Sequence, residues 1–131
     1  MSTPLYTKSI NCSIGKIHLR VDQIIEIQIT NEIEITEHDI EEMVLIIKKL
    51  SSLPLPAIFD HRIPHSFSYQ GLVSLSLIRS INGLALLVNK GLNKRVAECL
   101  QQFANSYPIQ IFEKKRTAVT WAMNYVQHSK V

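Results

Sequence analysis

The chain has 131 residues, of which 46% are hydrophobic and 19% are charged, and its formal net charge is +3 at pH 7. This length suits one domain with a sizeable buried core, and the composition is ordinary for a globular protein. No apolar run reaches the roughly 18 residues of a membrane-spanning helix, and the N-terminus lacks the pattern of a secretory signal. We therefore expect a single domain over residues 1–131 and a cytoplasmic location.

The charges divide unevenly along the sequence. Residues 1–42 carry three basic and eight acidic side chains, whereas residues 43–131 carry eleven basic and three acidic ones. A solvated surface on each half is the simplest interpretation. The pattern also allows the basic half to bind an anion, or two copies of the chain to pair acidic to basic.

The two cysteines, Cys12 and Cys99, lie far apart and form no CxxC pair. Without an export signal, both are expected to be reduced thiols. Cys99 falls among the apolar positions of a predicted helix, so a place in the core is the simpler interpretation.

The first part of the chain predicts a hairpin and a helix. Residues 14–20 and 24–30 are rich in β-branched side chains and bounded by turn residues, which predicts an antiparallel hairpin. Thr36 and Asp39 then form a capping-box pattern. Apolar residues recur at helical spacing from 40 to 50, which predicts an amphipathic helix with one buried stripe.

The rest of the chain alternates strands and helices. Short apolar segments at 57–61, 84–89 and 109–112 predict strands, and amphipathic segments near 93–105 and 114–127 predict the last two helices. This order specifies a small α/β domain with a mostly parallel sheet.

The helix between the first two of these strands has an unusual composition. It is expected to begin at Ser66 or Ser68 as the N-cap and to run to about Asn82, with Gly83 as its C-terminal glycine. Apolar residues occur nearly all the way round it, which indicates burial on several sides or cover by a partner. The sequence leaves two alternatives. The helix forms a homodimer contact, or other parts of the same chain cover it in a monomer.

Ligands of open α/β sheets bind beyond the carboxyl ends of the strands, and polar or basic residues follow each predicted strand here. The candidate partner- or anion-binding residues are Asp60, His61, Arg62, His65, Ser66 and Ser68 after the first strand, Lys90, Lys94 and Arg95 after the second, and Lys114, Lys115 and Arg116 after the third. The last three are unusual, because cations at the start of a helix oppose its dipole.

Catalytic and metal-binding patterns are weak in this sequence. It has no GxSxG, HExxH, GxGxxG or P-loop motif, and its four glycines are few for a loop that cradles phosphate. Asp60, His61 and His65 resemble a metal-binding set, but a third fixed ligand is not evident. We expect neither an enzyme nor a metal or cofactor.

Several segments together resemble the SpoIIAA-like branch of the STAS fold. They are Phe59-Asp60-His61-Arg62 with a serine opening the next helix, the strand segments at 84–88 and 108–112, and Ala118-Val119-Thr120-Trp121-Ala122. In that group a strand ending in Asp-x-Arg precedes the second helix, and a final Phe … Ala-x-x-Trp segment closes the domain. The match covers most of the chain and is closest to small stand-alone bacterial members of unknown function.

The resemblance implies a four- or five-stranded sheet with helices on one side, no cofactor, and a role in binding a protein or a small ligand. In the anti-sigma factor antagonists of this group, a serine at the start of the helix after the central strand is phosphorylated and switches partner binding. The Asp-Ser-[Ser/Thr]-[Gly/Ala] signature of that site is missing here, and Ser66 and Ser68 lie a few residues later. The predicted function is a non-catalytic protein-interaction module.

Two other functions stay open. SpoIIAA-like domains are also similar to the lipid-binding SEC14 fold, so a small amphiphilic ligand could lie under the second helix. An enclosed apolar cavity would favour that function, whereas a packed core with an exposed apolar patch would favour the interaction module. The basic residues could contact a nucleic-acid backbone weakly, but few aromatic residues lie near them, so no nucleic-acid partner is expected.

Overall fold

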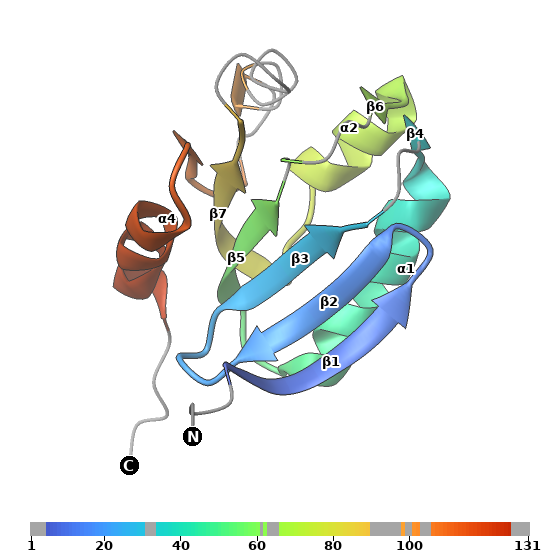
Figure 1. Ribbon diagram of the computed structural model, residues 1–131. Helices are drawn as coiled ribbons and strands as arrows, with labels where there is room; N and C mark the ends of the chain where they lie inside the picture. Colours follow the sequence, from blue (N-terminus) through green and yellow to red (C-terminus); the bar gives the residue numbers. More distant parts are fainter. Residues whose placement is uncertain are drawn as a thin grey trace.

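The computed structural model describes residues 5–30, 34–60, 62, 66–89, 98, 101, 102 and 106–126. Within these residues, six strands form one sheet in the order β1-β2-β3-β5-β7-β8 (Figure 1). The strands are β1 (Tyr6–Cys12), β2 (Gly15–Arg20), β3 (Ile25–Ile29), β5 (Leu55–Asp60), β7 (Ile81–Leu87) and β8 (Ile109–Phe112). The other elements are the parallel pair β4 (Glu34–Ile35) and β6 (Ser66–Phe67), the helices α1 (Glu37–Leu50), α2 (Tyr69–Ser76) and α4 (Lys115–Ala122), and the 3₁₀ turn η1 (Met123–Tyr125).

The pairing confirms the predicted α/β fold with an N-terminal antiparallel part. β1, β2 and β3 pair antiparallel, whereas β3, β5, β7 and β8 pair parallel. The sheet has six strands rather than four or five, because β1 adds an edge strand that the sequence analysis did not identify. β1 is half-buried at most, and only Ile10 and Cys12 pack against the core from it, so its sequence looks largely polar.

Helices cover both faces of the sheet, not one face as the resemblance implied. Side chains of α1 and α2 join one apolar cluster with every second residue of the central strands, such as Ala57 and Phe59. Ala118 and Ala122 of α4 pack on the opposite face against Ile58. β5 is therefore buried on both sides, which explains why Leu55 to Phe59 form a continuous apolar run.

The start of α1 is as predicted. Asp39 accepts a hydrogen bond from the backbone N–H of Thr36 at 2.9 Å, which completes the capping box. Asp39 also accepts one from the Ser13 hydroxyl at 2.7 Å, which ties the β1–β2 turn to the helix. Acidic residues in the first turn and Lys48 and Lys49 in the last complement the helix dipole.

The second helix is shorter than predicted. α2 ends at Ser76, and Gly83 lies inside β7 rather than at the helix end. A Cβ on Gly83 would lie 3.3 Å from the ring of Tyr125, so this glycine lets η1 pack closely on the strand. The prediction of a C-terminal glycine was wrong because Leu77, Ile78 and Ile81 continue the helical spacing of apolar residues past the end of the helix at Ser76.

The C-terminal part agrees with the sequence where it is described. α4 and η1 occupy most of the predicted 114–127 helix, and Trp121 and Tyr125 pack against the sheet as half-buried residues. The predicted helix near 93–105 lies mostly outside the described residues, as does Cys99. Cys12 is half-buried, and burial raises the pKa of its thiol, which disfavours the reactive thiolate. None of the described helices is long and apolar enough to cross a membrane.

Candidate functional site

At the carboxyl end of β5, two of the predicted residues form a local ion pair. Arg62 donates two hydrogen bonds to the Asp60 carboxylate, from Nε at 2.9 Å and from Nη2 at 2.7 Å. This pairing raises the pKa of Arg62. The Arg62 side chain is 43% exposed, so a partner could still reach it. Asn89 donates to the Arg62 carbonyl oxygen at 2.8 Å and links the ends of β5 and β7.

The two predicted serines have different roles. Ser68 is the N-cap of α2, where its hydroxyl oxygen accepts a hydrogen bond from the Gly71 N–H at 3.0 Å. Ser66 lies in β6, paired with β4, and is exposed. A modifying enzyme would find the Ser66 hydroxyl accessible, whereas the Ser68 hydroxyl already stabilises the helix.

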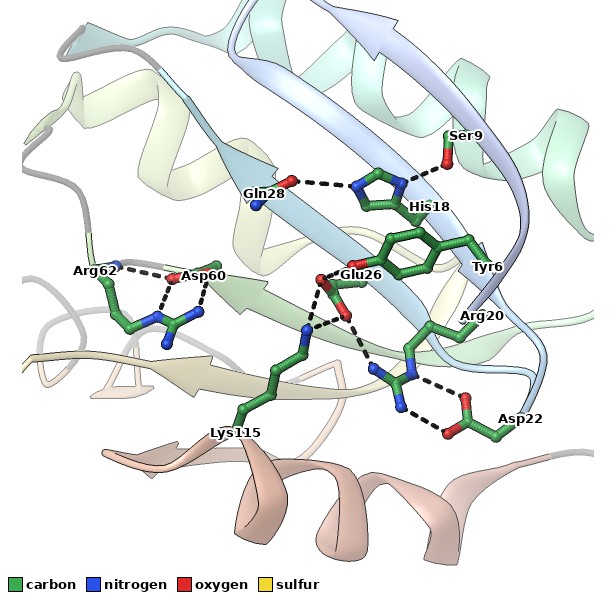
Figure 2. A network of polar contacts seen from close by, with 10 residues as sticks. All are labelled: Tyr6, Ser9, His18, Arg20, Asp22, Glu26, Gln28, Asp60, Arg62 and Lys115. Atoms are coloured by element: carbon green, nitrogen blue, oxygen red, sulfur yellow. Dashed lines mark hydrogen bonds and ion pairs between the residues drawn. The ribbon is translucent and has the colours of Figure 1, made fainter. Parts of the chain in front are cut away.

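The basic residues before and within the first turn of α4 are also unlike one another. Lys114 and Arg116 are exposed, whereas Lys115 reaches back over the sheet to the carboxylate of Glu26, with Nζ–O distances of 3.0 and 3.1 Å (Figure 2). This contact explains why a cation is tolerated near the N-terminus of a helix. Lys115 thus contributes to internal structure, and Lys114 and Arg116 stay as candidate contacts.

The remaining predicted residues, His61, His65, Lys90, Lys94 and Arg95, lie outside the described part of the chain. Their role stays a prediction. Among the residues that the structure does describe, no group of three or more His, Cys, Asp or Glu side chains is placed to hold a metal ion.

Glu26 is the centre of a polar network that the sequence analysis missed. Its side chain is 3% exposed, yet it accepts hydrogen bonds from the Tyr6 hydroxyl at 2.7 Å and from Arg20 Nη1 at 3.0 Å, in addition to Lys115. Burial by itself raises the pKa of Glu26, but the hydrogen bonds from Tyr6, Lys115 and Arg20 outweigh it and lower the pKa. Burial, together with the bond to Glu26, raises the pKa of Tyr6 to about 12. Asp22 pairs with the other side of Arg20 at 3.0 Å.

The network continues from Tyr6 to His18 and its hydrogen-bond partners. The Tyr6 ring stacks on the imidazole with centroids 3.9 Å apart, and both ring nitrogens are hydrogen-bonded, Nδ1 to Ser9 at 2.6 Å and Nε2 to Gln28 at 3.2 Å (Figure 2). Since its nitrogens are both engaged, His18 is poorly placed as a catalytic base. The network joins β1, β2 and β3 to one another, and Lys115 joins them to α4.

Only a faint signal of this network existed in the sequence. Glu26 and Gln28 alternate with isoleucines in β3, which is typical of a strand with one solvated face. The alternation identifies the polar face but does not say that Glu26 is buried there. The unfavourable position of Lys115 beside a helix N-terminus was the better clue.

An apolar groove lies on the other side of the molecule, between α1, the segment 51–54 and the end of α2. Its volume is about 790 Å³. Three of its leucines are largely exposed, Leu45 by 62%, Leu53 by 45% and Leu77 by 63%, so the groove is open to solvent. Its charged side chains are Glu41, Lys48 and Arg79, and its other lining residues are Ile40, Val44, Ser51, Ser52, Pro54, Ser74, Ile78 and Ser80. The all-round apolar composition of the second helix was the sequence signal for this surface.

No protein-family model matches this sequence, and no curated protein matches it. Among solved structures, the chain is similar to an uncharacterised protein of the DUF3478 family from Shewanella loihica PV-4, described as having a SpoIIAA-like fold. The similarity has a TM-score of 0.52 and covers 93% of this chain and 98% of the other, at 16% sequence identity. This chain has a SpoIIAA-like fold. At such low identity the comparison shows the fold alone.

The SpoIIAA-like fold positions the predicted residues at the end of β5 and at the start of the next helix. β5 ends at Asp60, Arg62 follows two residues later, and the next helix opens at Ser68, as the resemblance implied for the Asp-x-Arg strand and its helix. The polar network and the groove lie outside that motif. They are features of this chain's own side chains.

Replacing Lys115 by methionine should lower the free energy of unfolding by about 1–3 kcal/mol, because it leaves a buried carboxylate with fewer partners. The matched change Lys114→Met, at the exposed neighbouring lysine, should stay within about 0.5 kcal/mol of the wild type. Urea unfolding followed by circular dichroism measures both. Equal effects of the two substitutions would show that the Lys115–Glu26 contact contributes no stability.

The lowered pKa of Glu26 predicts an acid-dependent loss of stability. The folded protein keeps this carboxylate ionised more readily than the unfolded chain does, so its contribution is present above the ordinary value of 4.5 and is lost as the pH falls through the lower folded value. Urea unfolding from pH 7 to pH 3 should therefore show a shallower acid slope for Glu26→Gln than for the wild type. Identical slopes would contradict this assignment.

Proposed function

We propose that this SpoIIAA-like protein is a non-catalytic interaction module that binds a protein segment in the groove between α1 and α2. The observation that carries the proposal is the open apolar groove with Leu45, Leu53 and Leu77 exposed along it. Exposed apolar surface of this kind, with charged residues beside it, is typical of sites that bind other proteins. The cytoplasm, where Cys12 would stay reduced, is the location that goes with this proposal.

The shape of the groove favours a peptide over a small amphiphile. Its volume lies within the range of small-molecule pockets, so an amphiphilic ligand is the second candidate. Small-molecule sites, however, bury most of the ligand, and here an acyl chain would lie beside leucines that are themselves open to water. An amphipathic helix suits such a groove better, because it can bury one apolar stripe and keep its polar face in solvent.

The polar network supports a structural rather than a catalytic role. Glu26, Arg20 and Lys115 satisfy one another, and His18 is hydrogen-bonded through both nitrogens. A catalytic group needs a free lone pair or proton directed at a substrate. We therefore assign the network to holding the sheet and α4 together, and the groove to binding.

The proposal can be tested by photo-crosslinking in living cells. A photoreactive phenylalanine derivative at position 77 should form a protein adduct, since Leu77 lies in the groove and is largely exposed. The same derivative at position 21 is the matched control, because Val21 is 53% exposed but lies in the β2–β3 turn. Adding Leu45→Asp should abolish the adduct at position 77. No adduct at 77, an equal adduct at 21, or an adduct unaffected by Leu45→Asp would contradict the proposal.

A further inference from the structure

We propose that the occupant of this groove is a second copy of the same chain, with the two α1 helices packed antiparallel about a two-fold axis. This inference rests on the proposed function and names the partner. It is carried by the order of charged and apolar residues along the exposed face of α1.

Four residues of α1 that line the groove form one stripe. Glu41, Val44, Leu45 and Lys48 are spaced by three, one and three residues, so they lie on one face over two helical turns. Glu41 and Lys48 are both exposed. An acid therefore lies at one end of the stripe, a base at the other, and apolar side chains between them.

This order is complementary to itself in one orientation only. In a two-fold contact, residue i of one copy meets residue j of the other, and j meets i. If the helices run antiparallel about a point between Val44 and Leu45, then Glu41 meets Lys48 of the second copy, and Lys48 meets its Glu41. A parallel pair would place Glu41 against Glu41 and Lys48 against Lys48, which is repulsive.

The groove gives the apolar centre of this contact a place to pack. Leu45 of the second copy would meet Val44 in the groove that Leu53 and Leu77 also line, and the two-fold axis makes the reverse contact identical. Arg79, which also lines the groove, adds a second cation on the wall opposite α1. His38 Nδ1 lies 3.7 Å from the Glu41 carboxylate on the same helix, and both side chains are largely exposed, so Glu41 stays accessible.

The experiment is a charge exchange read by sedimentation equilibrium. The wild-type mass should rise from one chain toward two between about 1 μM and about 500 μM, the range expected for a small interface. Glu41→Lys and Lys48→Glu should each weaken association at least about tenfold, because each places like charges together at two symmetric positions. The double variant should return to within about threefold of the wild type. Lys49→Glu is the matched control, since Lys49 is exposed and outside the groove, and it should leave association unchanged.

Every outcome decides the inference. A mass of one chain at all concentrations overturns the inference. Association that neither single exchange weakens also overturns it, and so does a double variant that fails to recover the association of the wild type. The crosslinked product at position 77 separates this inference from the proposed function. An adduct with a different protein would uphold the groove as a binding site and overturn the second copy, whereas no adduct at all would overturn both.

Discussion

The buried carboxylate of Glu26 on β3 connects the antiparallel strands to α4 through side-chain contacts. It lies on the one face of the antiparallel strands that no described helix covers, and its neighbours Tyr6, Arg20 and Lys115 come from β1, β2 and α4. A buried charge is costly unless it is paired and hydrogen-bonded. The four groups therefore depend on one another, and α4 is fixed to the sheet by a charged contact at its N-terminus as well as by its alanines.

The same sheet explains why the binding surface lies on the other side. The central strands need apolar cover on both faces, which α4 supplies on one and α1 and α2 on the other. α1 turns Met43 and Ile47 inward to meet this need, and Val44 and Leu45 are left lining the groove. Because α2 is short, it does not close over them. An open apolar groove is the result, and binding at this groove leaves the Glu26 network untouched.

Much of the fold could be predicted from the sequence, because hydrophobic period and capping are local signals. The hairpin, α1 with its Thr36–Asp39 cap, and the parallel strands all follow from such signals. The site was harder to predict, since it depends on contacts between distant residues. Nothing near Lys115 in the sequence points to Glu26, 89 positions away. The groove depends on where α2 ends, and the apolar residues Leu77, Ile78 and Ile81 hid that boundary because they keep a helical spacing.

The proposed function depends on the groove binding protein rather than a small molecule. Native mass spectrometry of the protein purified from its own host, at rising collision energy, tests it most directly. If the groove binds a second copy, the spectra should show masses of one chain and of two chains with nothing added, and the larger species should dissociate into single chains. Loss of a small molecule of one fixed mass from the protein would contradict protein binding and would assign the groove to an amphiphilic ligand.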